Sequence, residues 1–356
     1  MKNDNTRLPG SGLTVGIDVG DKYSQICVLD VAAEVIDEGR VRTTWSAMGG
    51  RLGAMARCRV VIEVGGHSPW LSRLLEDLGH ECIVANPRRV RLIADSAKKN
   101  DRIDAETLAR LGRADPALLS PVFHRSEQAQ ADLAVIHSRR ALVETRTGLV
   151  NRVRSLAKAY GARLPPCDAR YFPERVAEHV PPQLGEAIRP LLEVVATVSA
   201  QIKTLDGRLE SMIAERYQQA RLLEQVTGVG PVISIGYILT IGDPHRFKSS
   251  RQVGAYLGLV PRQHSSGEKT PELGISKTGN VYLRQLLVNG AHYILGSRGP
   301  DCDLRRWGLR KAEGGKNAKK RAVIAVARKL AVLLHRLWIT GEVYTPLLHE
   351  EEVKAA

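Results

Sequence analysis

The pattern of apolar and polar residues changes twice along the chain. The first part has short apolar runs, one of them alternating with polar positions, and these predict strands. The first three are joined by tight links, which predict antiparallel neighbours. Later the apolar residues recur at helical spacing. Strands are expected at residues 13–19, 24–31, 34–44, 59–64 and 80–85, and helices at 46–57, 68–78 and 103–111.

Three antiparallel strands followed by alternating helices and strands is the order expected of an RNase H-like α/β domain. We place this domain at residues 1–125. Residues 126–221 contain two long amphipathic helical stretches, 127–160 and 184–221, on either side of a proline-rich segment at 163–182. They predict a coiled-coil arm or oligomerisation element.

The third part, residues 222–345, is predicted to be mostly helical and is followed by a tail at 346–356. Residues 222–232 resemble a helix-hairpin-helix, in which a turn containing Gly228 and Gly230 would point backbone N–H groups at a phosphate. Helices are expected at 250–257 and 281–295, separated by a loop rich in Gly, Ser and Lys. The basic stretch 304–338 includes Lys319, Lys320 and Arg321.

Charge narrows the choice of partner. Lys and Arg number 52 against 38 Asp and Glu, a net charge of +14. That balance favours a polyanionic partner, although a merely basic soluble or ribosome-associated protein would share it. Aromatic residues make up only 4%. Since single-strand binders rely on stacked aromatic side chains, we expect the protein to bind the phosphate backbone of a duplex or of structured RNA.

The five scattered cysteines, odd in number and without a C-x-x-C pair, indicate a reducing compartment and argue against a zinc site or a disulfide frame. No run of about 18 apolar residues predicts a membrane span, and residues 1–11 lack the apolar core of a secretion signal. We therefore expect a cytoplasmic protein with no membrane partner.

Four acidic residues carry the candidate chemistry. Asp18 and Glu63 lie inside apolar strand segments, where a carboxylate is costly unless it is paired. Asp101 and Asp104 are three residues apart at a helix start, so both can face the sheet. Carboxylates that converge from two strands and a helix suit Mg²⁺, with Mn²⁺ as the alternative, and two such ions support phosphoryl transfer.

Each acid also has a structural explanation. Asp18 could cap a turn, and Glu63 could form an ion pair with an arginine. Asp101 could be a helix N-cap, and Asp104 could be an acid favoured by the helix dipole. The positions of all four together favour the metal site.

The ordered motifs resemble the DEDD transposases (recombinases) of bridge-RNA-guided insertion sequences, over nearly the whole chain. The matching segments are Gly16-Ile17-Asp18, Ile62-Glu63, Asn86-Pro87, 99–105, Gly228-Val229-Gly230, 256–262, 276–280 and Leu283-Arg284. The resemblance implies a RuvC-like catalytic domain and a C-terminal transposase domain. It also implies a metal site at Asp18, Glu63, Asp101 and Asp104, and a serine nucleophile at Ser276.

Ser276 lies in a Gly- and Lys-rich loop before a helix, where Arg262, Lys277 and Arg284 would help to hold a phosphate. Attack by this serine would give a covalent protein–DNA intermediate that conserves bond energy for rejoining. The structural alternative is that Ser276 caps the following helix, and Ser265 and Ser266 lie in the same loop. His67, after Glu63, is expected either at the surface or beside the metal ligands, and not as a metal ligand itself.

The first hypothesis is thus an RNA-guided DNA transposase. Its partners are double-stranded donor and target DNA, a structured non-coding guide (bridge) RNA and further copies of the chain, in a dimer or tetramer. It would act in a prokaryotic cytoplasm, at the nucleoid. Three alternatives stay open: a RuvC-like junction endonuclease without a covalent intermediate, an ATPase of the sugar-kinase/actin type suggested by Asp18-Val19-Gly20, and a non-catalytic binding module.

Overall fold

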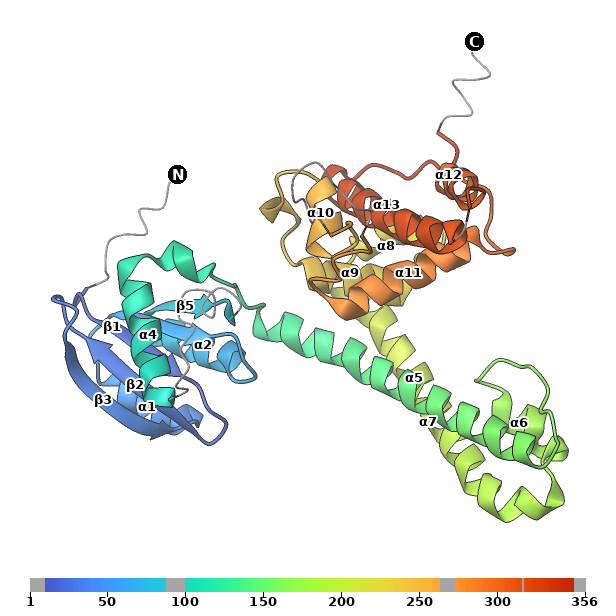
Figure 1. The fold of residues 1–356 in the computed structure, drawn as a ribbon, viewed down its shortest axis with the longest axis horizontal. Coiled ribbons are helices and arrows are strands. Elements are labelled where there is room, and N and C mark those ends of the chain that lie inside the picture. The colour runs from blue at the N-terminus through green and yellow to red at the C-terminus, as the bar shows by residue number, and fades with distance from the viewer. Residues whose placement is uncertain (1–9, 88–99, 263–272, 316, 349–356) are drawn as a thin grey trace, which may run out of the picture. The chain divides into compact units, whose positions relative to one another are not determined.

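The computed structural model of the protein describes residues 10–87, 100–262, 273–315 and 317–348. The chain divides into two compact units, Met1–Ser126 and Glu127–Ala356. The first contains β1 Thr14–Asp18, β2 Tyr23–Leu29, β3 Val35–Arg42, α1 Trp45–Gly53, β4 Arg59–Glu63, α2 Ser68–Asp77, β5 Glu81–Ala85, α4 Asp101–Ala114 and the 3-10 helix η1 Pro116–Leu119 (Figure 1).

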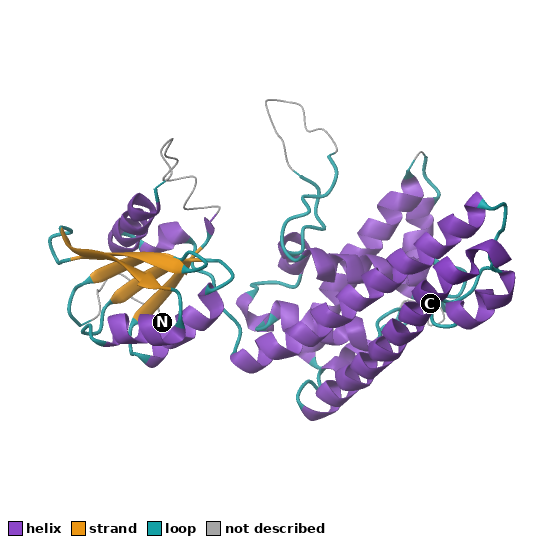
Figure 2. Ribbon diagram, turned by 90° about the horizontal axis from the view of Figure 1, so that it is seen from below, coloured by secondary structure: helices purple, strands orange, loops and turns teal. Residues whose placement is uncertain are grey.

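The five strands described in the first unit form one sheet, drawn in orange in Figure 2. Their order is β3-β2-β1-β4-β5. β1 is antiparallel to β2, and β2 is antiparallel to β3. β4 pairs with β1 and β5 in parallel. This arrangement confirms the predicted mixed α/β character of the N-terminal part. The expected element order is also observed, with end points that differ by a few residues.

Helices cover both faces of the sheet. Val15, Ile17, Val60 and Ile62 face α1 and α2 and form one core with their buried leucines. The opposite face carries α4, and the two layers meet at Gly16. A Cβ atom on Gly16 would lie 2.0 Å from the Ala105 carbonyl oxygen, so only glycine allows α4 to pack this closely on β1.

The regular elements described in the second unit are helices, joined by loops that include one isolated antiparallel bridge between Pro261 and Ile275. Its elements are α5 Glu127–Ala159, α6 Phe172–Val176, η2 Ala177–His179, η3 Pro182–Leu184, α7 Gly185–Glu215, α8 Ala220–Glu224, α9 Pro231–Ile241, η4 Pro244–Arg246, α10 Arg251–Tyr256, α11 Val281–Leu295, α12 Asp303–Ala312 and α13 Ala318–Thr340. The predicted mostly helical C-terminal part is confirmed. Among the described residues, no helix combines the length and hydropathy needed to cross a bilayer.

The helices α5 and α7 pack against each other in antiparallel directions. The Arg139 guanidinium contacts Asp206 at 2.5 Å, and Arg146 donates to the Ser199 hydroxyl at 3.3 Å. The contacting residues therefore rise in number along α5 and fall in number along α7, as expected for antiparallel helices. The proline-rich segment between the helices folds back on them, with Phe172 fully buried in the resulting apolar cluster.

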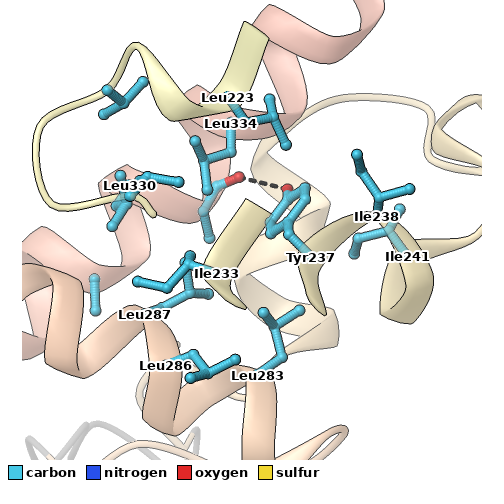
Figure 3. Close-up of a cluster of buried hydrophobic side chains, with 14 of the residues drawn as sticks. Leu223, Ile233, Tyr237, Ile238, Ile241, Leu283, Leu286, Leu287, Leu330 and Leu334 are labelled. Carbon is cyan, nitrogen blue, oxygen red and sulfur yellow. Dashed lines mark hydrogen bonds between the residues drawn. The ribbon is translucent and has the colours of Figure 1, made fainter. Parts of the chain in front are cut away.

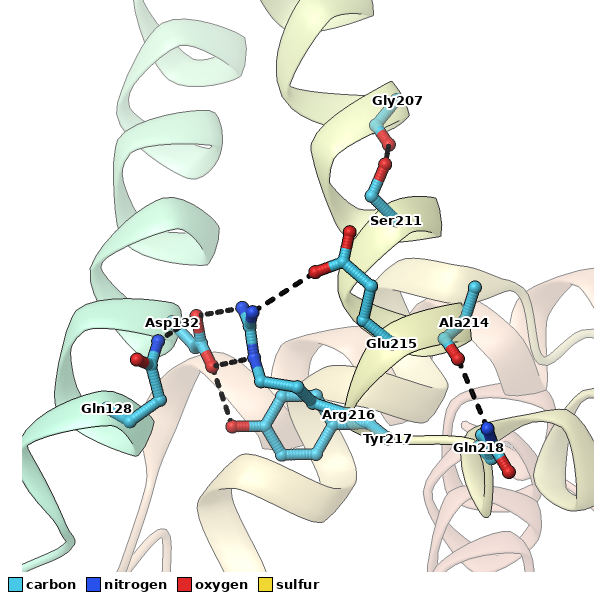
Figure 4. Close-up of polar contacts among 9 residues, drawn as sticks. All are labelled: Gln128, Asp132, Gly207, Ser211, Ala214, Glu215, Arg216, Tyr217 and Gln218. Carbon is cyan, nitrogen blue, oxygen red and sulfur yellow. Dashed lines mark hydrogen bonds and ion pairs between the residues drawn. The ribbon is translucent and has the colours of Figure 1, made fainter.

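The helix predicted to continue to residue 221 ends earlier, at Glu215. The reason is visible in Figure 4: Asp132 of α5 accepts two hydrogen bonds from Arg216 and one, at 2.7 Å, from the Tyr217 hydroxyl. Gln128 donates a further bond to the same carboxylate. Burial and the bond to Asp132 raise the pKa of Tyr217 to about 12. Asp132 is 3% exposed and joins the start of α5 to the end of α7.

We expect Asp132→Ala to lower the melting temperature by several degrees, because it leaves a partly buried arginine and a tyrosine hydroxyl without their shared acceptor. Glu215→Ala is the matched control, since Glu215 is exposed and contacts the same arginine at 3.2 Å. Thermal unfolding followed by circular dichroism measures both. If the two variants melt at the same temperature, the contacts of Asp132 do not stabilise the junction between the start of α5 and the end of α7.

The C-terminal core forms around α9 and α13 (Figure 3). The fully buried Tyr237 of α9 donates its hydroxyl to the Ala331 carbonyl oxygen of α13 at 2.7 Å. Most of α13, the central helix of this core, therefore lies within the basic stretch 304–338. One face of α13 is buried through Val326, Leu330 and Leu334, and its basic residues lie elsewhere on the helix.

Candidate active site and nucleic-acid surface

Asp18 and Glu63 lie side by side at one edge of the first unit's sheet. They are the last residues of β1 and β4, which are parallel neighbours with Ile17 opposite Ile62. Ile17 and Ile62 face α1 and α2, so the alternation of a strand directs Asp18 and Glu63 towards the face that carries α4. Both side chains are partly buried there.

The helix α4 brings the other two acids to the same edge. At its C-terminal end, Arg113 donates to the Gly12 carbonyl oxygen, which precedes β1, at 3.0 Å. In its first half, Ala105 lies against Gly16. Because α4 thus runs antiparallel to β1, Asp101 and Asp104 in its first turn lie towards the end of β1 at Asp18.

Two local contacts fix this first turn. The Asn100 side chain is the N-cap, accepting a hydrogen bond from the Arg102 backbone N–H at 3.1 Å. The alternative that Asp101 caps the helix is therefore wrong. An ion pair between Arg102 and Glu38 of β3 ties the start of α4 to the sheet.

The four carboxylates have the chemistry of a magnesium site but do not form one as they stand. Their oxygen atoms are hard ligands, and backbone geometry brings all four to one edge. Within the described ranges, no three His, Cys, Asp or Glu side chains are close enough together to hold a metal ion. The basic segment 88–99, which includes Arg88, Arg89 and Lys99, lies outside the described residues.

The loops that follow β1 and β4 are joined at the same edge. His67 contacts Asp21 at 3.4 Å through Nε2, and its Nδ1 accepts a hydrogen bond from the Trp70 indole at 3.0 Å. His67 is partly buried. Its contact with Asp21 links the loop after β4 to the loop after β1, a few residues beyond Glu63 and Asp18.

The Ser276 loop, in the second unit, is a rigid turn against the end of α10. The Ser276 and Lys277 backbone N–H groups donate to the carbonyl oxygens of Val260 and Gly258 at 2.8 and 3.1 Å. The Ser276 hydroxyl lies 3.0 Å from that of Thr278. Lys277 adopts a φ of +56°, the left-handed region that a side chain rarely occupies. Strain of this kind persists only where surrounding contacts impose it.

The helix after this loop has another cap. The Asn280 side chain accepts a hydrogen bond from the Leu283 backbone N–H at 2.8 Å, and α11 begins at Val281. The alternative that Ser276 caps this helix is therefore wrong. Ser265 and Ser266 lie outside the described residues.

The predicted nucleic-acid contacts differ in position. Lys277, Arg262, Lys319, Lys320 and Arg321 are exposed. Arg284 is 8% exposed, and its Nη1 donates to the carbonyl oxygens of Leu257 and Thr278. The structure thus gives Arg284 a contact with the Ser276 loop itself, and a contact with phosphate stays a prediction.

The turn of the predicted helix-hairpin-helix packs against α11. Gly228 has a φ of +82°, and a Cβ atom there would lie 2.9 Å from the Gly290 carbonyl oxygen. The preceding helix α8 has only five residues. Close packing therefore accounts for Gly228, while phosphate binding by Gly228 and Gly230 stays a prediction.

A broad concavity in the second unit collects basic side chains that the sequence scatters. It is lined from α10, the Ser276 loop, α12, α13 and the segment after α13, and includes the acids Asp303 and Glu342. Its basic lining residues are Arg251, Lys277, Arg306, Arg310, Lys311, Lys320, Arg321, Arg328, Lys329 and Arg336. Such an excess of positive charge beside Ser276 suits a polyanion.

Lys329 lies among other positively charged side chains of this concavity. Its ammonium lies 4.0 Å from the centre of the Trp307 ring. Burial lowers the pKa of Lys329, and the neighbouring charges of Arg310 and Lys311 lower it further. The sequence showed these residues as basic, but their convergence depends on the packing of α12 against α13.

One unit carries an acidic sheet edge, and the other carries a serine loop beside a basic concavity. These features suit a protein that acts on nucleic acid. Residues 220–303 match the family model described as Transposase IS116/IS110/IS902 family, and residues 15–161 match the DEDD transposase model of IS110. The chain belongs to this IS110/IS116 transposase family.

The relatives agree along most of the chain. The transposase for insertion sequence element IS1111A of Coxiella burnetii is 30% identical over 336 residues, which are 93% of this chain and 90% of that protein. A probable family 20 transposase of Pseudomonas aeruginosa is 31% identical over 300 residues, 81% and 86% of the two chains. A pilin gene-inverting protein of Moraxella bovis is 25% identical over 279 residues, 76% of each.

Proposed function

We propose that the protein is a DNA transposase that cuts and rejoins DNA strands with a serine nucleophile and a magnesium-dependent acidic site. The observation that carries this proposal is the placement of Asp18, Glu63, Asp101 and Asp104 at one sheet edge within a chain of the family. The strand order and directions of the sheet support the assignment of this unit as RNase H-like.

In this proposal Asp18 and Glu63 would hold Mg²⁺, and Asp101 and Asp104, in the first turn of α4, would complete the site. The ion, when bound, neutralises charge on the reacting phosphate. Ser276 supplies the attacking oxygen: a bond forms from its Oγ to phosphorus as the bond from phosphorus to a deoxyribose oxygen breaks. The serine proton passes to solvent and the released oxygen takes one up, so the adduct is still a phosphodiester.

The basic concavity beside Ser276 supports binding of a nucleic-acid backbone. Lys320 and Arg321 at the start of α13, together with Lys277, give it charge at both the serine loop and α13. We propose that donor and target DNA are bound with a structured guide RNA, whose base pairing selects the sequence while the protein holds the backbone. The antiparallel arm of α5 and α7 would join protomers into a dimer or tetramer.

Reconstitution tests the proposal. The protein is incubated with Mg²⁺, donor and target duplexes, and RNA transcribed from the DNA that flanks the gene. We expect joined donor–target strands and a protein–DNA adduct, both dependent on the RNA. A scrambled RNA of equal length is the control. Joining at the same rate with the scrambled RNA would contradict guidance, and hydrolysed ends without an adduct would favour the junction-endonuclease alternative.

A further inference from the structure

Arg284 of α11 is buried in an unusual way for an arginine. It is 8% exposed, and the hydrogen bonds of its Nη1 go to two backbone carbonyl oxygens, of Leu257 at 2.9 Å and of Thr278 at 2.7 Å. Burial lowers the pKa of its guanidinium. Removing a cation from water is costly, so a buried arginine needs strong, well-directed contacts in return.

The two carbonyls belong to two different segments. Leu257 is the C-cap residue that follows α10, and Thr278 lies in the Ser276 loop. One side-chain nitrogen of α11 therefore ties the loop to the helix it packs against. The tie acts next to the nucleophile, because the Thr278 hydroxyl is 3.0 Å from the Ser276 hydroxyl.

Two glycines show how closely the loop is held. A Cβ atom on Gly258 would lie 2.4 Å from both the N and the O of Thr278, and one on Gly279 would lie 2.0 Å from the Tyr256 carbonyl oxygen. Both glycines have positive φ. Backbone contact of this kind, together with the left-handed Lys277, leaves the loop few alternative conformations.

We propose that Arg284 and Thr278 are positioning residues for Ser276: Arg284 fixes the Thr278 peptide, and the Thr278 hydroxyl orients the Ser276 hydroxyl for attack. This inference rests on the proposed function of Ser276 as the nucleophile. An orienting hydrogen bond of about 1 kcal/mol corresponds to several-fold in rate, and misplacement of a reacting atom by 1 Å to about a hundredfold.

The test measures the rate of adduct formation at saturating DNA, the affinity for the same DNA by fluorescence anisotropy, and the melting temperature. The probe is a duplex that spans the junction of the element with its flank, with Mg²⁺ and the flanking RNA. We expect Arg284→Met to slow adduct formation by about a hundredfold with DNA affinity within about twofold. Arg284→Lys, which keeps a donor and the charge, should recover part of the rate.

Arg305→Met is the matched control. Arg305 also donates through Nη1 to two carbonyl oxygens, those of Ile294 and Gly296, both at 2.5 Å, but it ties the end of α11 and not the serine loop. It should lower the melting temperature as Arg284→Met does while leaving the adduct rate unchanged. An equal slowing in both variants would show a general structural effect and overturn the inference.

Thr278→Val provides a second measurement that does not depend on a buried group, because Thr278 is exposed. We expect its rate to fall by about tenfold at an unchanged melting temperature, and Thr278→Ser to retain most of the rate. An unchanged rate in Thr278→Val overturns the role of the hydroxyl. Ser276→Ala is measured in parallel: an adduct that persists there refutes the proposed function, whereas its loss together with normal rates in the other variants refutes only the positioning.

Discussion

Replacement of Ser276 by alanine is expected to abolish the covalent protein–DNA adduct and to reduce strand joining by at least about a thousandfold, because alanine lacks the hydroxyl that is proposed to supply the attacking oxygen. DNA affinity should change little. The Ser276 side chain contacts the Thr278 hydroxyl and is only partly buried, so the fold of the loop should survive. Denaturing gels with end-labelled DNA measure the adduct.

Three controls make the Ser276 result specific. Ser211→Ala removes a serine hydroxyl that bonds the Gly207 carbonyl oxygen on α7, and it should form the adduct at the normal rate. Ser265→Ala and Ser266→Ala test the two other serines of the same sequence segment. If the adduct persists in Ser276→Ala and disappears in one of these two variants, the nucleophile has been assigned to the wrong residue.

Replacement of Asp18 by asparagine is expected to reduce strand cleavage by on the order of a hundredfold or more, because an amide holds a divalent cation far less well than a carboxylate does. The effect should be partly offset by a higher Mg²⁺ concentration or by Mn²⁺. Chelation of divalent ions should abolish strand cleavage by the unsubstituted protein in the same assay. Asp18 ends β1, where an amide of the same shape can be accommodated.

Asp21→Asn is the matched control, because Asp21 lies in the loop directly after β1 and its side chain is 91% exposed. Its cleavage rate and magnesium dependence should remain normal. Equal activity of Asp18→Asn and the unsubstituted protein, at a limiting Mg²⁺ concentration, would remove the metal site from the proposal. A binding module without catalysis predicts that result, with a change in stability alone.

Local patterns were sufficient for the elements and for the choice of candidates. Short apolar runs identified β1 and β4, alternation with period two identified β2, and helical period identified α5 and α7. Acids inside apolar strands singled out Asp18 and Glu63 because burial of a carboxylate is costly in any fold. The end of α7 at Glu215 was missed, because the cause is a contact with Asp132, far away in sequence.

Spatial convergence required the tertiary structure. The direction of α4 across β1, which brings Asp101 and Asp104 to the edge at Asp18, depends on the close approach at Gly16. The burial of Arg284 under the serine loop and the gathering of basic residues between α12 and α13 also depend on packing between distant segments. The chain alone therefore indicated which groups could react. Which of these groups lie close together, and which contacts fix them, depends on packing between segments far apart in the sequence, and local periodicity carries no information about such packing.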